Sequence, residues 1–180
     1  MKRNPRNIPV EPDDQQQEAS ESVDPIIEPL HPVLVAVAGH LAEHKIAYSV
    51  MATGAAIMFS MSEKVFTWST VINVFDDRKL LHVAARLPLF VPAARRREAA
   101  ALLSRLNYRT LIGAWQMDHA DGEVIYVATH LFGDRIPEED TIHTLCRVTC
   151  VMVGDEGPKI LRLIRKSSGS RLQLPPPGSN

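Results

Sequence analysis

The chain has 180 residues, of which 45% are hydrophobic and 23% are charged, and this composition is that of an ordinary globular protein with one domain. Its formal net charge of −1 argues against a strongly basic nucleic-acid binder and against an acidic tail protein. The sequence contains no run of roughly 18 apolar residues, which a membrane-spanning helix needs, and its start lacks the apolar core of a signal peptide. We therefore expect a cytoplasmic protein that does not enter a membrane.

The two ends of the chain differ in composition from its middle. Residues 1–30 are rich in Pro, Gln, Glu, Asp and Ser, and they carry three basic against seven acidic residues. Residues 167–180 hold a Ser-Ser-Gly-Ser run and a Pro-Pro-Pro-Gly run. Segments of this kind bury too little apolar surface to offset the entropy of ordering them. The sequence therefore predicts disordered tails at 1–30 and 167–180 around one domain at 31–166.

Residues 31–87 predict a helix followed by three strands. After His31-Pro32, apolar residues recur at helical spacing to near Lys45, which indicates one amphipathic helix. Apolar and polar residues alternate in three later runs, and such alternation is typical of strands with one buried face. The expected strands cover residues 56–61, 66–74 and 81–87, with polar turns between them. Together they predict an antiparallel meander.

The next segment predicts a second helix and a β-hairpin. Pro92 suits the first turn of a helix, where its missing N–H has no partner, and this helix reaches about Asn107. Two strands are expected at residues 109–118 and 123–131. Asp121-Gly122 lies between them, and Asp-Gly is among the strongest short signals of a hairpin turn.

A third helix is expected after Pro137. Acidic residues in its first turn suit the helix dipole, and apolar residues at helical spacing predict an inner face. The Gly154–Pro158 segment predicts a kink or break, followed by a short helical continuation. The order is thus helix, three strands, helix, two strands, helix. This order predicts an α+β fold, in which an antiparallel sheet of about five strands carries helices on one face and at its ends.

The run His40-Leu41-Ala42-Glu43-His44 matches the H-x-x-E-H pattern of inverted zinc peptidases, in which two histidines bind the metal and the glutamate activates water. On a helical wheel, however, His40, Glu43 and His44 lie on the flank and back of the apolar stripe, so we expect them to face solvent. A catalytic zinc also needs a third protein ligand, which the sequence does not show. A polar helix flank is the preferred interpretation, and a small zinc-dependent hydrolase is the alternative.

His143, Cys146 and Cys150 lie along one side of the third helix. One helix alone cannot enclose a metal ion, and cysteine is among the most buried residue types. We therefore expect two core cysteines with free thiols, as in a reducing compartment, and a histidine at the edge of the core. No set of residues predicts a metal site, a cofactor site or a catalytic group.

Arg95, Arg96 and Arg97 lie at the start of the second helix, where positive charge opposes the helix dipole. Such a cluster could bind phosphate, nucleic acid or an acidic protein segment. Charge blocks usually serve only to keep a surface solvated, so a solvated face is the preferred interpretation. Weak binding of nucleic acid or phosphate is the alternative.

Trp68 and Trp115 both lie in expected strands and alternate with polar neighbours, so we expect both in the core. If no helix covers Trp68, Thr70 and Ile72, their face of the sheet would form an apolar patch large enough to mark an interface. These three residues and the three arginines are the candidate partner-binding residues.

Several short motifs of the domain also specify its fold. In chain order they are Leu87-Pro88, Val91-Pro92, Leu106-Asn107, Gly113, Asp118, Asp121-Gly122-Glu123 and Pro137. Asn107 can cap a helix end, Gly113 permits a bulge or close packing, and Asp121-Gly122 closes a turn. With these motifs, residues from about 31 to 166 resemble the YbjN domain family, also described as bacterial sensory transduction regulators. None of the motifs is a catalytic signature.

The resemblance implies a fold like that of type III secretion chaperones, with a curved antiparallel sheet backed by helices. It also implies a regulatory or chaperone-like role without known chemistry. Because the sequence assembles no acid, base, nucleophile or phosphate loop, we expect a non-enzymatic protein-interaction domain. Its expected partner is an unidentified protein, and a homodimer through a sheet edge or a helix face is a further expectation.

Overall fold

The computed structural model describes residues 29–51 and 54–165. In chain order the elements are α1 (Pro32–Glu43), β1 (Tyr48–Val50), β2 (Ala56–Ser62), β3 (Thr67–Phe75), the 3₁₀ turn η1 (Asp76–Arg78), β4 (Leu80–Arg86), the 3₁₀ turn η2 (Ala93–Arg95), α2 (Arg96–Asn107), β5 (Ala114–Met117), β6 (Val124–Leu131) and α3 (Glu139–Arg165). The predicted α+β fold is confirmed. The predicted tails fall almost wholly outside the described residues. No helix within those residues is long and apolar enough to cross a membrane.

The sheet of the described chain has six strands in the order β1-β2-β3-β4-β6-β5, and all neighbouring pairs are antiparallel. β2, β3 and β4 form the predicted meander. The sequence did not predict β1, because three residues are too few to show an alternating pattern. β5 is shorter than the predicted strand at 109–118, since residues 109–113 form a loop before it.

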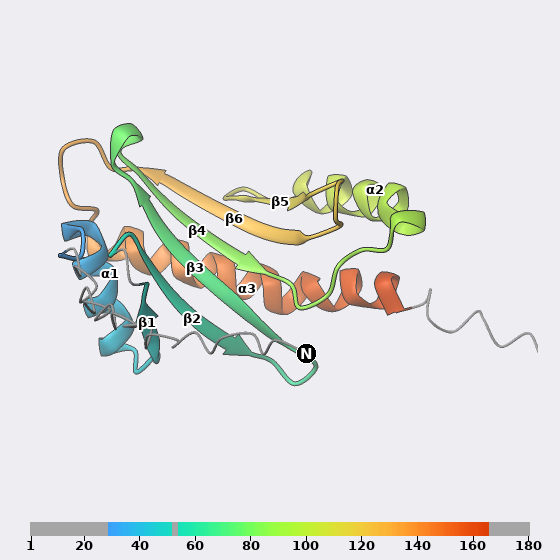
Figure 1. Cartoon of the computed structure of the whole chain (residues 1–180), viewed down its shortest axis with the longest axis horizontal. Coiled ribbons are helices and arrows are strands. Elements are labelled where there is room, and N and C mark those ends of the chain that lie inside the picture. The colour runs from blue at the N-terminus through green and yellow to red at the C-terminus, as the bar shows by residue number, and fades with distance from the viewer. Residues whose placement is uncertain (1–28, 52–53, 166–180) are drawn as a thin grey trace, which may run out of the picture.

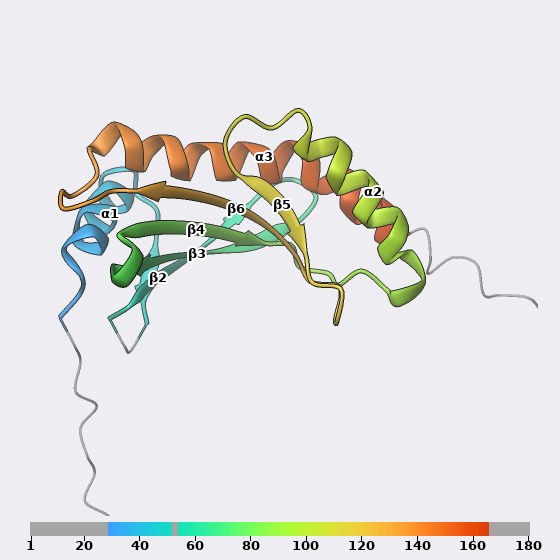
Figure 2. The same ribbon diagram turned by 90° about the horizontal axis from the view of Figure 1, so that it is seen from above.

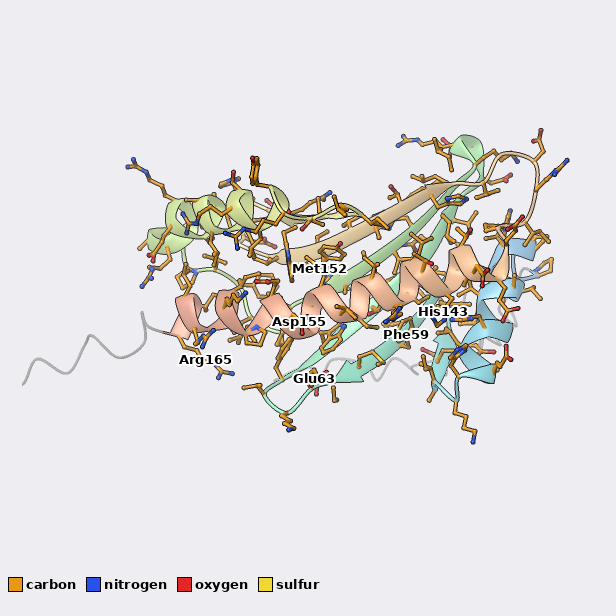
Figure 3. All side chains as sticks on the ribbon, turned by 180° about the vertical axis from the view of Figure 1, so that it is seen from behind. Phe59, Glu63, His143, Met152, Asp155 and Arg165 are labelled. Carbon is orange, nitrogen blue, oxygen red and sulfur yellow. The ribbon has the colours of Figure 1, made fainter. Side chains whose placement is uncertain are left out.

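All three helices of the described chain lie on one side of the sheet (Figures 1 and 2). α3 crosses that face and contacts β4 and β6, while α1 packs on β2 and β3 and α2 packs on β5. Figure 3 looks onto this helical side, where α3 runs in front of the strands from His143 to Arg165. Inward side chains of the strands, such as Ile72 and Tyr126, join the helices in one core. Figure 2 shows no helix on the opposite face.

α3 is one helix of 27 residues, so the break predicted at Gly154–Pro158 is wrong. A proline inside a helix removes a backbone hydrogen bond and costs about 3 kcal/mol. The buried face of α3 nevertheless continues past the proline to Ile160, Leu161 and Ile164. Burying each such side chain contributes about 1.5–3 kcal/mol, so packing against the rest of the core outweighs the cost of the proline.

Gly157 sets how closely α3 approaches the strands. A Cβ atom at this position would lie 2.7 Å from Cζ of Phe66 and 3.3 Å from Cδ2 of Leu87. Both distances are tighter than ordinary van der Waals contact. The missing side chain of Gly157 therefore lets the backbone of α3 rest directly on these two core residues.

β5 and β6 form the predicted hairpin around Asp121-Gly122. Gly122 has a φ of +89°, and a Cβ there would lie 2.1 Å from the carbonyl oxygen of Val91. Only glycine fits this turn. At the outer side of β5, the Asn107 side chain donates to the carbonyl of Trp115 at 2.9 Å and accepts its N–H at 2.8 Å. Asn107 thus pairs with a strand edge, where the sequence suggested a helix cap.

Candidate functional site

The open face of the sheet is formed by the strand residues that point away from the helices. Successive side chains of a strand point to opposite faces, so every second residue belongs to this face. Cross-strand pairing aligns five apolar residues across five strands. We call them the open-face row: Met58, Val71, Ala84, Val127 and Ala114. Figure 1 views the sheet from this side, with α3 behind the strands.

Polar side chains lie on both sides of the open-face row. One flanking row contains Ser60, Ser69 and Arg86 together with the apolar Ile125, and the other contains Asn73, His82 and Thr129 together with Ala56. Met58 in the open-face row is 42% exposed, and Phe75 and Leu131 beyond the second polar row are 41% and 72% exposed. An apolar centre with polar surroundings is the usual make-up of a protein-binding surface.

The open face carries almost no formal charge. Among all residues of the six strands, Arg86 is the only Lys, Arg, Asp or Glu. Its Nε lies 2.5 Å from Oε1 of Glu123, so an ion pair neutralises it. The strands therefore offer a contacting molecule apolar surface and hydrogen-bonding groups but no unpaired charge.

The edges of the sheet offer much less surface than its open face. The edge strands β1 and β5 have three and four residues. The pairing of Asn107 with Trp115 also occupies backbone groups on the outer side of β5. Short or blocked edges leave few backbone groups for strand addition from another chain.

Trp68, Thr70 and Ile72 do not form an exposed patch. Their exposed fractions are 3%, 0% and 0%, because they point to the side of the sheet that the helices cover. The predicted burial of Trp68 and Trp115 is confirmed. Since helices cover Trp68 and its two neighbours, the condition under which they would mark an interface is not met.

Arg95, Arg96 and Arg97 do not form a free basic cluster. Arg95 pairs with Glu98 at 2.6 Å between Nη2 and Oε2. Arg96 donates from Nη1 to the carbonyl oxygen of His119 at 2.9 Å and so joins α2 to the hairpin loop. Arg97 is exposed and makes no ion pair with the described residues. Two of the three guanidinium groups are therefore already engaged in contacts within the domain.

A second apolar surface lies on the helical side. A groove of about 430 Å³ separates α3 from the loop at residues 109–113. Leu111 and Ile112 in this loop are 100% and 42% exposed. The α3 side of the groove includes His143, Val148, Val151 and Met152.

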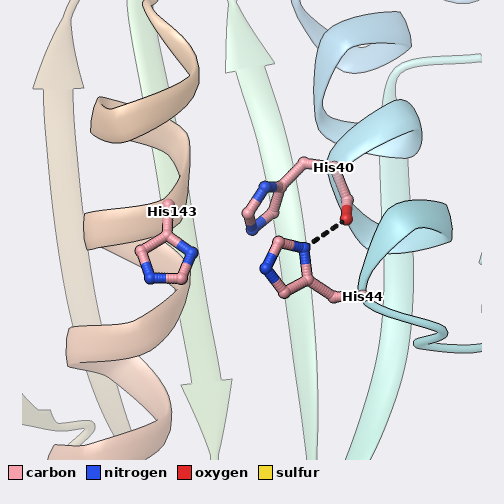
Figure 4. Close-up of side chains that lie close together, drawn as sticks. All are labelled: His40, His44 and His143. Atoms are coloured by element: carbon pink, nitrogen blue, oxygen red, sulfur yellow. Dashed lines mark hydrogen bonds between the residues drawn. The ribbon is translucent and has the colours of Figure 1, made fainter.

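The helical wheel predicts that His40, Glu43 and His44 face solvent, and this prediction is wrong only for His40. His40 is only 6% exposed, because α3 packs beside α1 and a wheel of one helix does not include its neighbour. His44 is exposed at the C-cap of α1, and Glu43 is exposed beside it. His143 of α3 completes a three-histidine cluster (Figure 4).

The three imidazole rings are in close contact. The ring centroid of His40 lies 4.3 Å from that of His44, and the centroid of His143 lies 5.4 Å from each of the other two. Burial lowers the pKa of His40 below its usual value, and the neighbouring His44 and His143 lower it further. His40 is therefore held in the neutral form, which is the form that binds metal ions.

The two cysteines lie in or beside the core, as predicted. Cys146 is buried and Cys150 is half-buried, and both are free thiols. Burial raises the pKa of Cys146 to about 12 and that of Cys150 to about 11. Both thiols stay protonated near neutral pH and are poor nucleophiles, because the thiolate is the reactive form.

The sequence analysis missed two features that the fold creates. The first is the open-face row, for which the outward positions of the expected strands gave a signal, since Val71 and Ala84 are apolar there. The second is the approach of His143 to His40 and His44. The chain carries histidines at the edge of the apolar stripe of both helices, but sequence alone does not show that the two helices are neighbours.

The fold and its surfaces define an α+β domain whose antiparallel sheet is covered by helices on one side only. The sequence profile of the YbjN family, described as "Putative bacterial sensory transduction regulator", matches residues 34–149. The chain belongs to this family. It is similar to the crystal structure of YbjN, described as a putative transcription regulator from E. coli, with a TM-score of 0.50 and 12% identity over 75% of this chain and 91% of that chain. The predicted fold is thus confirmed. No curated protein matches the sequence.

Proposed function

We propose that this chain is a non-enzymatic regulatory domain of the bacterial cytoplasm that binds another protein through the open face of its sheet. In a chaperone-like mode, an uncharged apolar segment of the partner lies along the open-face row. The observation that carries the proposal is the uncovered sheet face, on which an apolar row crosses five strands between two rows made mostly of polar residues. The description of the family as regulators supports it.

The chemistry of the face determines the expected partner segment. Met58, Phe75 and Leu131 expose apolar surface, and removing such surface from water contributes about 25 cal/mol per Å². The flanking serine, asparagine and threonine side chains can pair with polar groups of the partner, as the rim of an interface does. Because Glu123 already neutralises Arg86, an acidic segment gains no ion pair on the strands.

Photo-crosslinking in cells that produce the protein tests this proposal. A photoreactive amino acid replaces Met58 in the open-face row or, as the matched control, the exposed Arg97 of α2. We expect a covalent adduct with another protein from position 58 and none from position 97. Val71→Glu should abolish the adduct, because it places a charge next to Met58 in the row. Ser62→Glu, which adds the same charge at the end of β2, should retain it.

Circular dichroism first establishes that Val71→Glu has the fold of the parent protein. An adduct from position 97 without one from position 58 would contradict the proposed surface. An adduct from position 58 with the mass of two copies of this chain would show that the open face binds a second copy of the chain and not a different protein. An adduct that survives Val71→Glu unchanged would show that the apolar row does not determine binding.

A further inference from the structure

The three-histidine cluster lies where α1 meets α3, on the helical side of the molecule (Figure 4). His40 and His44 are four residues apart, so consecutive turns of α1 bring their rings to one side of the helix. His143 lies near the start of α3 and faces them from the neighbouring helix. One helix alone could not surround a metal ion, but α1 and α3 together place imidazole groups on two sides of the same point between them.

The hydrogen bonds of the cluster leave ring nitrogens available. His44 donates from Nδ1 to the carbonyl oxygen of His40 at 3.0 Å, so Nε2 of the neutral His44 ring carries a free lone pair. An outer hydrogen bond of this kind orients metal-binding histidines and fixes their tautomer. Nδ1 of His40 is buried and has no hydrogen-bond partner among the described residues. In Figure 4 the other nitrogen of this ring, Nε2, is the one that faces His44.

We propose that His40, His44 and His143 together bind one divalent transition-metal ion, with Zn²⁺ as the expected ion. Three protein ligands leave the fourth position of a tetrahedral ion for a water molecule. Three imidazoles suit Zn²⁺, Co²⁺, Ni²⁺ and Cu²⁺, whereas Mg²⁺ and Ca²⁺ prefer oxygen ligands. This metal site is separate from the open face and goes beyond the proposed function. Experiments can therefore refute the metal site without refuting the proposed function, and the reverse also holds.

The separation of the ligand atoms is close to that of a zinc site. Tetrahedral zinc with Zn–N bonds of about 2.0–2.1 Å places its ligand nitrogens about 3.4 Å apart. One ring nitrogen from each histidine lies within 4.8 Å of the other two. Closure by about 1.4 Å at most would complete this geometry. Rotation of the exposed His44 and the half-buried His143 can supply this change while both helices stay in place.

A bound ion would join the first helix of the domain to its last helix. α1 and α3 are far apart in the sequence, and they meet through side-chain packing. A ligand that binds only the folded chain stabilises it in proportion to the logarithm of the ligand concentration above its Kd. The melting temperature should therefore rise with added Zn²⁺ and should not change with Mg²⁺.

Titration of the full chain without a polyhistidine tag tests the site. Co²⁺ serves as the optical probe, because its visible absorption distinguishes tetrahedral coordination from the hydrated ion. We expect one Co²⁺ per chain with tetrahedral bands, displacement by one equivalent of Zn²⁺, and no displacement by excess Mg²⁺. Absence of Co²⁺ and Zn²⁺ binding by the parent chain would overturn the proposal.

Single substitutions assign the ligands. His40→Ala, His44→Ala and His143→Ala should each abolish the tetrahedral bands and weaken Zn²⁺ binding by more than about 100-fold, because loss of an outer-shell partner alone weakens binding about 10–100-fold. His119→Ala changes an exposed histidine outside the cluster and should bind as the parent does. His44 is exposed, so His44→Ala keeps the core intact and is the decisive variant. Binding by His44→Ala as tight as that of the parent would refute the three-histidine site.

Discussion

The two faces of the sheet share the same strands but meet different requirements. On β3, Trp68, Thr70 and Ile72 point toward the helices and are almost fully buried, whereas Val71 lies among them and points to the open side. Packing against the helices restricts the residues of the covered face. No helix of the described chain covers the open face, although exposure within its apolar row ranges from 7% at Val127 to 42% at Met58. One strand therefore encodes the core in one half of its residues and a free surface in the other half.

Truncation of one side chain on each face of β3 should give the largest contrast. Trp68→Ala removes a buried aromatic ring and leaves a cavity, so we expect the free energy of unfolding to fall by about 3–5 kcal/mol. Val71→Ala on the open face should lower it by less than about 1 kcal/mol, which is the range of strand preferences. Urea denaturation measures both values. Similar losses in the two variants would mean that the open face is packed as tightly as the covered one.

A smaller effect is expected where α3 rests on the covered face. Gly157→Ala places a methyl group 2.7 Å from Phe66, and overpacking of this kind costs about 1–3 kcal/mol. Gly154→Ala is the matched control one turn earlier, where the new Cβ lies 3.5 Å from the side chain of Glu63. Alanine is a better helix former than glycine, so this control should gain about 0.5–1 kcal/mol.

Thermal and urea denaturation of the two glycine variants should therefore change in opposite directions. If Gly157→Ala is as stable as Gly154→Ala, the contact between α3 and Phe66 is loose and does not set the height of the helix above the sheet. The comparison separates helix propensity from packing, because both substitutions have the same chemistry and lie on the same helix.

The sequence predicted the covered face better than it predicted the site. Alternation in β2, β3 and β4 and the Asp121-Gly122 turn are local signals, and each of these elements was found. The continuity of α3 through Pro158 was not predictable locally, because it depends on burial of Ile160, Leu161 and Ile164 against the rest of the core. Local rules describe what an element prefers by itself, and packing then decides between close alternatives.

The candidate surfaces depended still more on tertiary structure. The burial of His40 and its contact with His143 arise from the packing of α1 beside α3, which no spacing within one helix reveals. By contrast, the burial of Trp68 was predicted from its place in an alternating strand, and it is confirmed. The open-face row was encoded in the outward residues of the strands, but its continuity across the sheet required the registers of four strand pairs.

The smallest expected effect concerns the pH dependence of stability on the open face. His82 lies in the polar row beside Phe75, with a ring-centroid distance of 5.6 Å. Desolvation lowers the pKa of His82 below its usual value of 6.5. At a pH well above 6.5, the His82 ring is neutral in both the folded and the unfolded chain. As the pH falls below it, the unfolded chain takes up a proton first, so the free energy of unfolding decreases until folded His82 is protonated as well.

His82→Gln should therefore flatten part of the loss of stability that begins as the pH falls through about 6.5, measured by urea denaturation at each pH. His40 also has a lowered pKa and will retain its own share of the slope. His119→Gln, at an exposed position, should leave the slope of the parent unchanged. An unchanged slope in His82→Gln would mean that this part of the open face is hydrated like ordinary surface. The apolar residues around His82 would then be too far apart to exclude water from its ring. Such a hydrated surface would not support the proposal that the open-face row binds a partner.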